Sequence, residues 1–193
     1  MKNILLSLLM IAFSTSAFAK SVSELTLRNG KYYEPFSATL ANGQYEIYYE
    51  NGQLKHKTTY KDGKREGLYE WYHDNGQLKE RGTYKDGKRY GPTESYYENG
   101  QLQVRFTYKD GELEGLTEGY FENGQLQVRG TYKDGKSYGL TELYYENGQL
   151  EVRGTYKDGI MDGLRESYEK DGTLITKAFY VNGDRFECEG KCG

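Results

Sequence analysis

The sequence is poor in the residues that build a thick globular core or a reactive centre. Its 193 residues include only 2 prolines, 2 histidines, 2 cysteines and a single tryptophan. Ile, Val and Leu are scarce after the first 20 residues, and no later segment is apolar enough to span a bilayer. Basic and acidic residues alternate without forming a basic block, so the sequence gives no sign of nucleic-acid binding.

Glycine and tyrosine are the abundant residues, with 25 and 21 copies. Tyrosine favours strands and glycine favours tight turns, so this composition predicts a β-rich protein. Hydrophobic residues make up only 36% of the chain, which predicts a thin buried layer. The formal net charge is -3, too small to define a class of partner.

Residues 1–19 have the three parts of a secretory signal peptide. Lys2 supplies the charge, Ile4 to Phe13 form a short apolar stretch, and Ala17-Phe18-Ala19 end the segment with small residues. We expect cleavage after Ala19 and export of the mature protein to the periplasm, the cell surface or the surroundings of a bacterium. A buried N-terminal helix is the alternative interpretation.

Both cysteines, Cys188 and Cys192, lie in the last six residues of the chain. In an oxidising compartment this pair favours a disulfide that closes a small loop. Free thiols are the next alternative. A metal site is the last, because no histidine lies nearby to complete a ligand set. No cofactor is indicated.

The dominant feature of the sequence is a repeat with a step of 24 residues. Three turn signals recur at this step, and the first two are dipeptides of the kind that close β-hairpins. The first occurs at Asn51-Gly52, Asn75-Gly76, Asn99-Gly100, Asn123-Gly124, Asn147-Gly148 and Asp171-Gly172. The second occurs at Asp62-Gly63, Asp86-Gly87, Asp110-Gly111, Asp134-Gly135, Asp158-Gly159 and Asn182-Gly183. A lone glycine is the third, at Gly43, Gly67, Gly91, Gly115, Gly139 and Gly163.

Both dipeptides predict two-residue type I′ turns, which fix the register of the strands. With Asn75-Gly76 at the two turn positions, Tyr72 faces Lys79 and Glu70 faces Arg81. The same rule opposes an acid and a base in all six hairpins: Glu46–Lys57, Glu70–Arg81, Glu94–Arg105, Glu118–Arg129, Glu142–Arg153 and Glu166–Lys177. Opposed charges stabilise a sheet, so this agreement supports the register.

The fold predicted is all-β: an elongated, single-layer antiparallel meander of tandem hairpins. One face carries the Glu–Arg pairs, and the other carries a tyrosine column with Gly82, Gly130 and Gly154. We expect a tyrosine ring over each of these glycines. Residues 20–43 are predicted to form N-terminal capping strands, 44–183 the repeat array and 184–193 a cysteine-containing tail.

The repeat unit resembles the bacterial variant of the MORN repeat. The clearest copies run from Gly115 to Asp134 and from Gly139 to Asp158, and residues 27–33 look like the usual start of such an array. Similar arrays occur in YwqK-type antitoxin components. The resemblance covers roughly residues 25–184. It implies an elongated, twisted antiparallel sheet in a single layer and a role in contacts with proteins or membranes.

No catalytic pattern stands out. The acids recur with the repeat and face bases, which indicates a structural role. His73 holds a repeat position that is otherwise aromatic, and His56 holds the position of Glu80 and Val104. Neither a nucleophile elbow nor a phosphate-binding glycine loop is present. An enzyme is therefore the class we expect least.

The aromatic columns provide the candidate binding residues. Most tyrosines are expected to stabilise the sheet by stacking, whereas aromatic positions that change between repeats are freer to bind a partner. Trp71 is our first candidate contact, with local packing as the alternative. The full set of candidates is Tyr69, Trp71, His73, Tyr97, Phe121 and Tyr145.

Three functions are compatible with such a surface. The leading hypothesis is an exported, non-catalytic scaffold that binds a protein partner. A surface that binds glycans or the cell envelope, membrane surfaces included, is the second. The third is an antitoxin-like neutraliser of a partner toxin.

Overall fold

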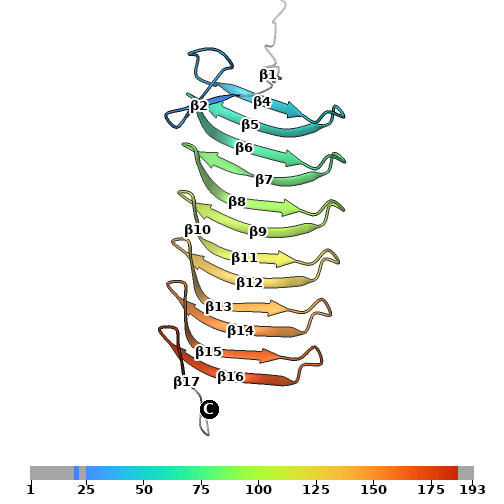
Figure 1. The fold of residues 1–193 in the computed structure, drawn as a ribbon, viewed down its shortest axis with the longest axis vertical. Coiled ribbons are helices and arrows are strands. Elements are labelled where there is room, and N and C mark those ends of the chain that lie inside the picture. Colours follow the sequence, from blue (N-terminus) through green and yellow to red (C-terminus); the bar gives the residue numbers. More distant parts are fainter. Residues whose placement is uncertain (1–19, 22–24, 187–193) are drawn as a thin grey trace, which may run out of the picture.

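The computed structural model describes residues 20–21 and 25–186. Over these residues the chain forms one open sheet of 15 strands and a separate two-stranded sheet, with no helix (Figure 1). Consecutive strands of the array pair in antiparallel fashion, except that the two-residue strand Glu112–Leu113 pairs only with the strand before it. The predicted all-β, single-layer meander is therefore confirmed.

The array contains two strands per repeat, stacked along the long axis of the molecule (Figure 1). In order, they are β4 (Gly43–Tyr48), β5 (Leu54–Lys61), β6 (Lys64–Tyr72), β7 (Leu78–Lys85), β8 (Lys88–Tyr96), β9 (Leu102–Lys109), the short β10 (Glu112–Leu113), β11 (Gly115–Tyr120), β12 (Leu126–Lys133), β13 (Lys136–Tyr144), β14 (Leu150–Lys157), β15 (Ile160–Tyr168) and β16 (Leu174–Val181).

Short elements lie at both ends of the array. At the first end, β1 (Lys20–Ser21) pairs in parallel with β4. Strands β2 (Thr26–Arg28) and β3 (Lys31–Tyr33) form the separate hairpin. At the last end, β17 (Asp184–Phe186) pairs with β16. The predicted signal peptide and the cysteines Cys188 and Cys192 lie outside the described residues.

The Asp-Gly turns adopt the predicted type I′ conformation. This turn needs a positive φ at both central residues, and Asp62 and Gly63 have φ values of 49° and 74°. The other members of this column repeat the pattern, including Asn182-Gly183 at the end of the array. Aspartate and asparagine tolerate this conformation better than other side chains do.

The same prediction was wrong for the Asn-Gly turns. At Asn75-Gly76 only the glycine has a positive φ, 84°. The Gly76 N–H donates to the His73 carbonyl over 3.0 Å, which makes a type I turn followed by a glycine bulge. The Asn75 side chain holds this form, because it accepts from the Gln77 N–H and donates to the Glu98 carbonyl one repeat later.

The bulge changes the register only at the tip of each hairpin. Tyr72 lies opposite Leu78 rather than Lys79, whereas Glu70 still lies opposite Arg81. A second irregularity follows each Asp-Gly turn, where the lone glycine column also has positive φ values, such as 79° at Gly67. Bulges bend strands, so each repeat contains two points at which the sheet departs from a flat ribbon.

The two faces of the sheet differ in burial. We call the face that carries Tyr45, Tyr60 and Tyr69 the inner face, because these three rings are buried. The face that carries Glu70 and Arg81 is the outer face. Ala41, Tyr45 and Tyr60 form the compact centre of the first repeat, and Leu25 and Tyr32 pack against them. The core is thin, as the composition predicts.

The glycines inside the strands make room for different neighbours. A Cβ at Gly82 would lie 2.8 Å from the ring of Tyr69, as predicted. At Gly130 the nearest side chain is Thr141, and at Gly154 it is Met161. A tyrosine ring over each glycine was therefore wrong for these two positions, because the inner face is not the same from one repeat to the next.

Candidate functional site

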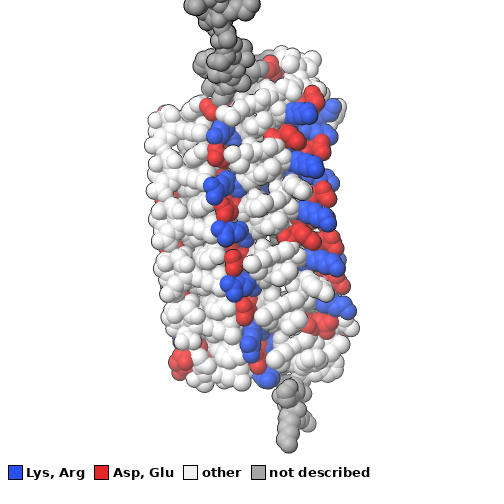
Figure 2. Space-filling view, turned by 180° about the vertical axis from the view of Figure 1, so that it is seen from behind, with Lys and Arg blue, Asp and Glu red and all other residues white. Residues whose placement is uncertain are grey.

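The outer face carries an unbroken row of alternating charge. The predicted acid–base pairs within hairpins are present, and acids also oppose bases between hairpins, as with Lys57 and Glu70. The row appears in Figure 2 as a line of alternating red and blue along the molecule. Its members are Glu46, Lys57, Glu70, Arg81, Glu94, Arg105, Glu118, Arg129, Glu142, Arg153, Glu166 and Lys177.

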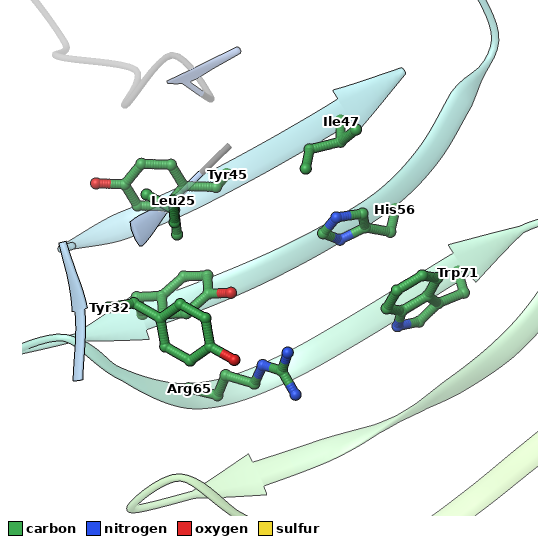
Figure 3. A pocket seen from close by; sticks show the side chains of 8 residues that line it. Leu25, Tyr32, Tyr45, Ile47, His56, Arg65 and Trp71 are labelled. Atoms are coloured by element: carbon green, nitrogen blue, oxygen red, sulfur yellow. The ribbon is translucent and has the colours of Figure 1, made fainter. Parts of the chain in front are cut away.

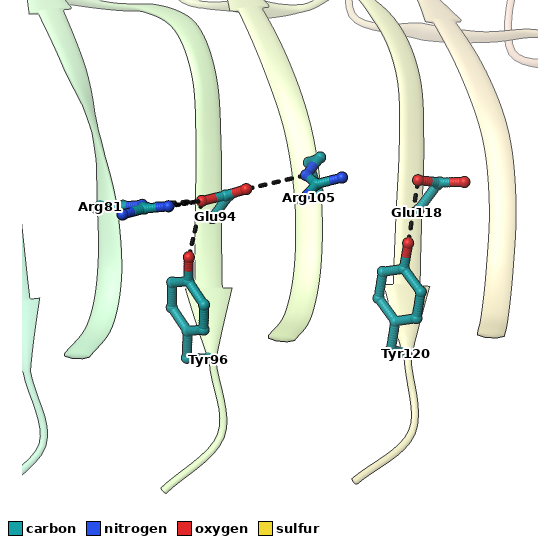
Figure 4. A network of polar contacts seen from close by, with 6 residues as sticks. All are labelled: Arg81, Glu94, Tyr96, Arg105, Glu118 and Tyr120. Carbon is teal, nitrogen blue, oxygen red and sulfur yellow. Dashed lines mark hydrogen bonds and ion pairs between the residues drawn. The ribbon is translucent and has the colours of Figure 1, made fainter. Parts of the chain in front are cut away.

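Glu94 shows how an acid is held in this row (Figure 4). Arg81 donates to one carboxylate oxygen over 2.7 Å and Arg105 to the other over 3.0 Å. The hydroxyl of Tyr96, on the same strand, donates to Glu94 over 2.8 Å. Burial alone would raise the pKa of Glu94, but the bonds from Tyr96, Arg81 and Arg105 outweigh it and lower the pKa.

The outer charges therefore neutralise one another. Glu166 repeats the arrangement with Arg153 and Lys177, and its pKa is also lowered despite burial. Exposed pairs of this kind each contribute about 1 kcal/mol or less to stability. A row in which each charge faces its opposite offers no excess charge to a partner, so the row serves the fold.

Four of the predicted contact residues lie at the tips of the Asn-Gly hairpins. The hydroxyls of Tyr97 and Tyr145 donate to backbone carbonyls of the following repeat, and Nε2 of His73 contacts the Tyr96 carbonyl at 3.0 Å. Phe121 holds the same position without a hydroxyl. These side chains connect consecutive repeats, and His73 and Tyr97 also line a pocket of the inner face together with Glu80 and Ser95.

Tyr69 and Trp71 lie on the inner face of β6, but in different surroundings. Tyr69 is completely buried, and its hydroxyl donates to Glu80 over 2.7 Å. Burial and this bond raise the pKa of Tyr69. Trp71 keeps 37% of its surface exposed and lines a pocket. Of the two, Trp71 is the one placed to touch a partner.

The pocket beside Trp71 has a volume of about 230 Å³ (Figure 3). Tyr45 and Tyr60 form part of its lining, together with Leu25, Tyr32, Ile47, His56 and Arg65. Leu25 and Tyr32 come from the N-terminal segment and the rest from β4, β5 and β6. The N-terminal segment therefore closes one side of the pocket.

His56 presents an unpaired nitrogen in this pocket. Its ring stacks on Trp71 with 4.6 Å between the ring centres and 12° between the planes. Its Nδ1 atom is buried and makes no hydrogen bond in the described structure. Burial, with the charges of Arg65 and Lys55, lowers the pKa of His56, so the ring is neutral at pH 7.

Two arginines of the inner face are each held between tyrosine rings. The guanidinium carbon of Arg65 lies 5.2 Å from the ring centres of both Tyr32 and Tyr84. Arg89, one repeat later, lies over the rings of Tyr69 and Tyr108 at 5.6 and 5.4 Å. Contacts of this kind between a guanidinium group and tyrosine rings are favourable cation–π interactions.

The pocket beside Trp71 continues along the array. A second pocket of about 260 Å³ shares Arg65 and Trp71 with the first. A third, of about 580 Å³, shares Lys79 and Glu80 with the second and reaches Ser95 and Gln103. We call the three together the inner trough. It crosses the strands from β4 to β9.

The inner trough is where the repeats differ from one another. Arg65 and Arg89 are replaced by Leu113, Ser137 and Met161 in later repeats, and Trp71 by Ser95, Gly119 and Leu143. Sequence reasoning identified Trp71, His73 and Tyr97 but missed Arg65, Arg89 and Glu80 as members of the same site. Their departure from the residues of the later repeats was the available signal.

Comparison with known proteins agrees with this architecture. The pattern of the MORN repeat variant matches residues 41–62, 65–86, 89–110, 113–134, 138–158 and 161–182. The chain belongs to the MORN repeat variant family. MORN repeats are generally associated with binding to proteins or membranes. No curated protein matches the chain.

Neither a metal-binding cluster nor a membrane-spanning helix lies among the described residues of this MORN chain. Within residues 20–21 and 25–186, no cluster of His, Cys, Asp and Glu side chains is placed to hold a metal ion. Nor does that part of the chain contain a helical segment that could span a bilayer. The inner trough contains the residues that depart from the repeat, so it is our candidate site.

Proposed function

We propose that this MORN protein is an exported, non-catalytic scaffold that binds a protein partner through the inner trough. The observation that carries the proposal is the clustering of irregular residues. Positions that serve the fold repeat along the whole array, as the outer charge row and the turns do. His56, Arg65, Trp71 and Glu80 break the repeat and line connected pockets.

The chemistry of the trough suits binding. Tryptophan, tyrosine and arginine are the residues that contribute most to protein interfaces, and all three line the trough. Trp71 is partly exposed but is held in place by stacking on His56. A side chain that is already ordered loses little entropy on binding, so such an anchor favours association.

The N-terminal sequence supports export. Residues 1–19 have the charge, the apolar stretch and the small-residue end of a signal peptide. An exported partner, or one displayed on the cell envelope, is therefore the target to seek. A toxin neutralised by this chain would be one such partner, in keeping with the resemblance to antitoxin components.

Site-specific crosslinking in the producing cell tests the proposal. A photoreactive phenylalanine analogue at position 71 should attach one dominant protein, because this position lies in the trough. The same analogue at position 116 is the control, since Leu116 is 50% exposed on the outer face. Equal capture from both positions, or none from position 71, would refute binding through the trough.

The exposed indole of Trp71 also favours a second candidate, a glycan of the cell envelope. Aromatic rings bind the apolar faces of sugars, and the trough supplies polar groups beside the ring. Soluble cell-wall fragments that change the fluorescence of Trp71, together with an absence of protein crosslinks, would establish this candidate in place of a protein partner.

A further inference from the structure

We propose that the pocket between Arg65, His56 and Trp71 captures the C-terminal carboxylate of an extended peptide chain. The proposal rests on the proposed function and specifies the part of the partner that enters the trough. Four features of the pocket support it: an unpaired cation, the absence of the acid found in the next repeat, apolar walls, and a closed end.

Among the described residues, Arg65 has no carboxylate partner. Its guanidinium carbon lies 5.2 Å from the ring centres of both Tyr32 and Tyr84, so these two rings restrict the directions from which a ligand can approach. Its Nη1 donates to the Tyr84 hydroxyl over 3.1 Å. No described carboxylate forms an ion pair with it, although the pocket beside it is open.

Arg89 shows what Arg65 lacks. It occupies the same position one repeat later and also lies near two tyrosine rings, Tyr69 and Tyr108, but its Nη2 donates to Glu80 over 2.8 Å. The residue equivalent to Glu80 one repeat earlier is His56, which is neutral at pH 7 and has an unpaired Nδ1. A carboxylate supplied by a ligand would form with Arg65 the ion pair that Glu80 forms with Arg89.

The walls of the pocket suit an apolar side chain next to that carboxylate. Leu25 and Ile47 line it together with the rings of Trp71, Tyr32 and Tyr60. A pocket of about 230 Å³ accommodates one side chain of the size of leucine or phenylalanine. A terminal residue of this kind places its charge and its apolar group within a few bonds of each other.

The shape of the trough favours the end of a chain. The N-terminal segment closes the trough at Leu25 and Tyr32, whereas the other pockets continue toward β9. From β6 to β9 the trough crosses three strand spacings, about 14 Å, which four extended residues span. Each peptide has one terminal carboxylate, which the closed end can receive at Arg65, a cation with no carboxylate partner among the described residues.

Trp71 makes the test direct, because it is the single tryptophan of the chain. The full chain, purified after expression from its complete sequence, is titrated with N-acetylated tetrapeptides that end in each of the twenty residues. Each peptide is tested as a free acid and as a C-terminal amide. Free acids ending in Leu, Ile or Phe should shift the Trp71 emission and bind about ten-fold or more tightly than the amides.

Two substitutions locate the carboxylate. Arg65→Gln removes the cation and should weaken binding of the free acids about ten-fold or more. His56→Glu places a carboxylate beside Arg65, as Glu80 lies beside Arg89, and should abolish binding while keeping the unfolding midpoint at or above that of the parent chain. Arg105→Gln, on the outer face, is the control and should bind as the parent does.

Three results would overturn the proposal: equal affinity for acids and amides, no binding across the whole peptide set, or preference for a uronic-acid oligosaccharide. Its failure is separable from failure of the proposed function. If crosslinks from position 71 map to internal residues of a partner protein, the trough binds protein but not a chain end. If they map to the last few residues of the partner, both proposals stand.

Discussion

The first repeats and the last repeats share one backbone but differ on the inner face. Both halves have the same two turns, the same strand pairing and the same outer charge row. Around β6 and β8 the inner face holds Tyr69, Arg65, Arg89 and Glu80 in a network of rings and charges. Around β13 and β15 it holds Thr141, Ser137 and Met161.

The difference teaches that the fold does not require the aromatic network. The later repeats form the same hairpins with small and aliphatic side chains at these positions. Stability in such arrays comes from each repeat and its contacts with its neighbours. The first repeats can therefore carry a specialised surface without altering the rest of the array.

The largest effect is expected from truncating the buried ring of the first half. Tyr69→Ala removes a completely buried side chain and its bond to Glu80, and should destabilise the first repeats by about 3 kcal/mol or more. Thr141→Ala, three repeats later, should cost about 1 kcal/mol or less. Hydrogen exchange of the amides in β6 and β13 measures both. Equal losses of stability in the two variants would show that the inner-face side chains stabilise both halves of the array equally.

Alanine substitutions at Gly82 and Gly154 should change the stability by smaller amounts, with a loss at Gly82 and no loss at Gly154. A Cβ at Gly82 would lie 2.7 Å from Thr93 Oγ1 and 2.8 Å from Tyr69, so Gly82→Ala should cost about 1–3 kcal/mol. At Gly154 the nearest atom is the flexible Met161 Cε at 3.4 Å. Gly154→Ala should be neutral or stabilise by up to about 1 kcal/mol. Urea unfolding of the two variants decides, and loss of stability in both would contradict the prediction.

At the hairpin tips, a substitution at Phe121 can supply the tyrosine hydroxyl that the equivalent positions of neighbouring repeats have. Tyr97 and Tyr145 each donate to a carbonyl of the next repeat, whereas Phe121 cannot. Phe121→Tyr supplies a hydroxyl for the Tyr144 carbonyl and should stabilise by about 1 kcal/mol. Tyr145→Phe is the reverse change and should cost a similar amount. A thermal unfolding midpoint that moves in neither variant would show that these bonds contribute nothing net.

The smallest expected effect concerns the pH dependence of stability that His56 contributes to the first repeats. Burial, Arg65 and Lys55 lower the pKa of His56 below its usual 6.5, so the folded state takes up a proton less readily than the unfolded state. Stability from this group is present above pH 6.5 and is lost as the pH falls through the folded pKa. His56→Val, the residue of later repeats, should flatten the loss between pH 7 and 5 in thermal unfolding. An unchanged pH profile would exclude His56 as its source.

The strand pattern was accessible from the sequence because its signals are local. An Asp-Gly pair and alternating side chains define a hairpin without reference to the rest of the chain, and Glu70 opposite Arg81 confirms the register. The conformation of Asn75-Gly76 was not accessible, because the dipeptide alone allows two turns and the form adopted depends on the bond from the Gln77 N–H to the Asn75 side chain. The last turn, Asp171-Gly172, adopts the same form with the equivalent bond from the Thr173 N–H to the Asp171 side chain.

The candidate site was only partly accessible for a related reason. Trp71 is conspicuous as the single tryptophan, but an arginine is ordinary in a chain rich in charge. Arg65 matters because Tyr32 from the N-terminal hairpin and Tyr84 from the following repeat close on it. Such a cluster is assembled from three elements, and no spacing within one repeat reveals it.

The arrangement of the strands also determines how the molecule yields to tension. They lie across the long axis, and each bonds to its sequence neighbours (Figure 1). A pull applied between the two ends therefore acts on one row of backbone bonds at a time and peels hairpins off in sequence. Each 24-residue repeat that opens would release about 80 Å of extended chain. The protein would lengthen stepwise at low force, with the hairpins that remain folded keeping their structure.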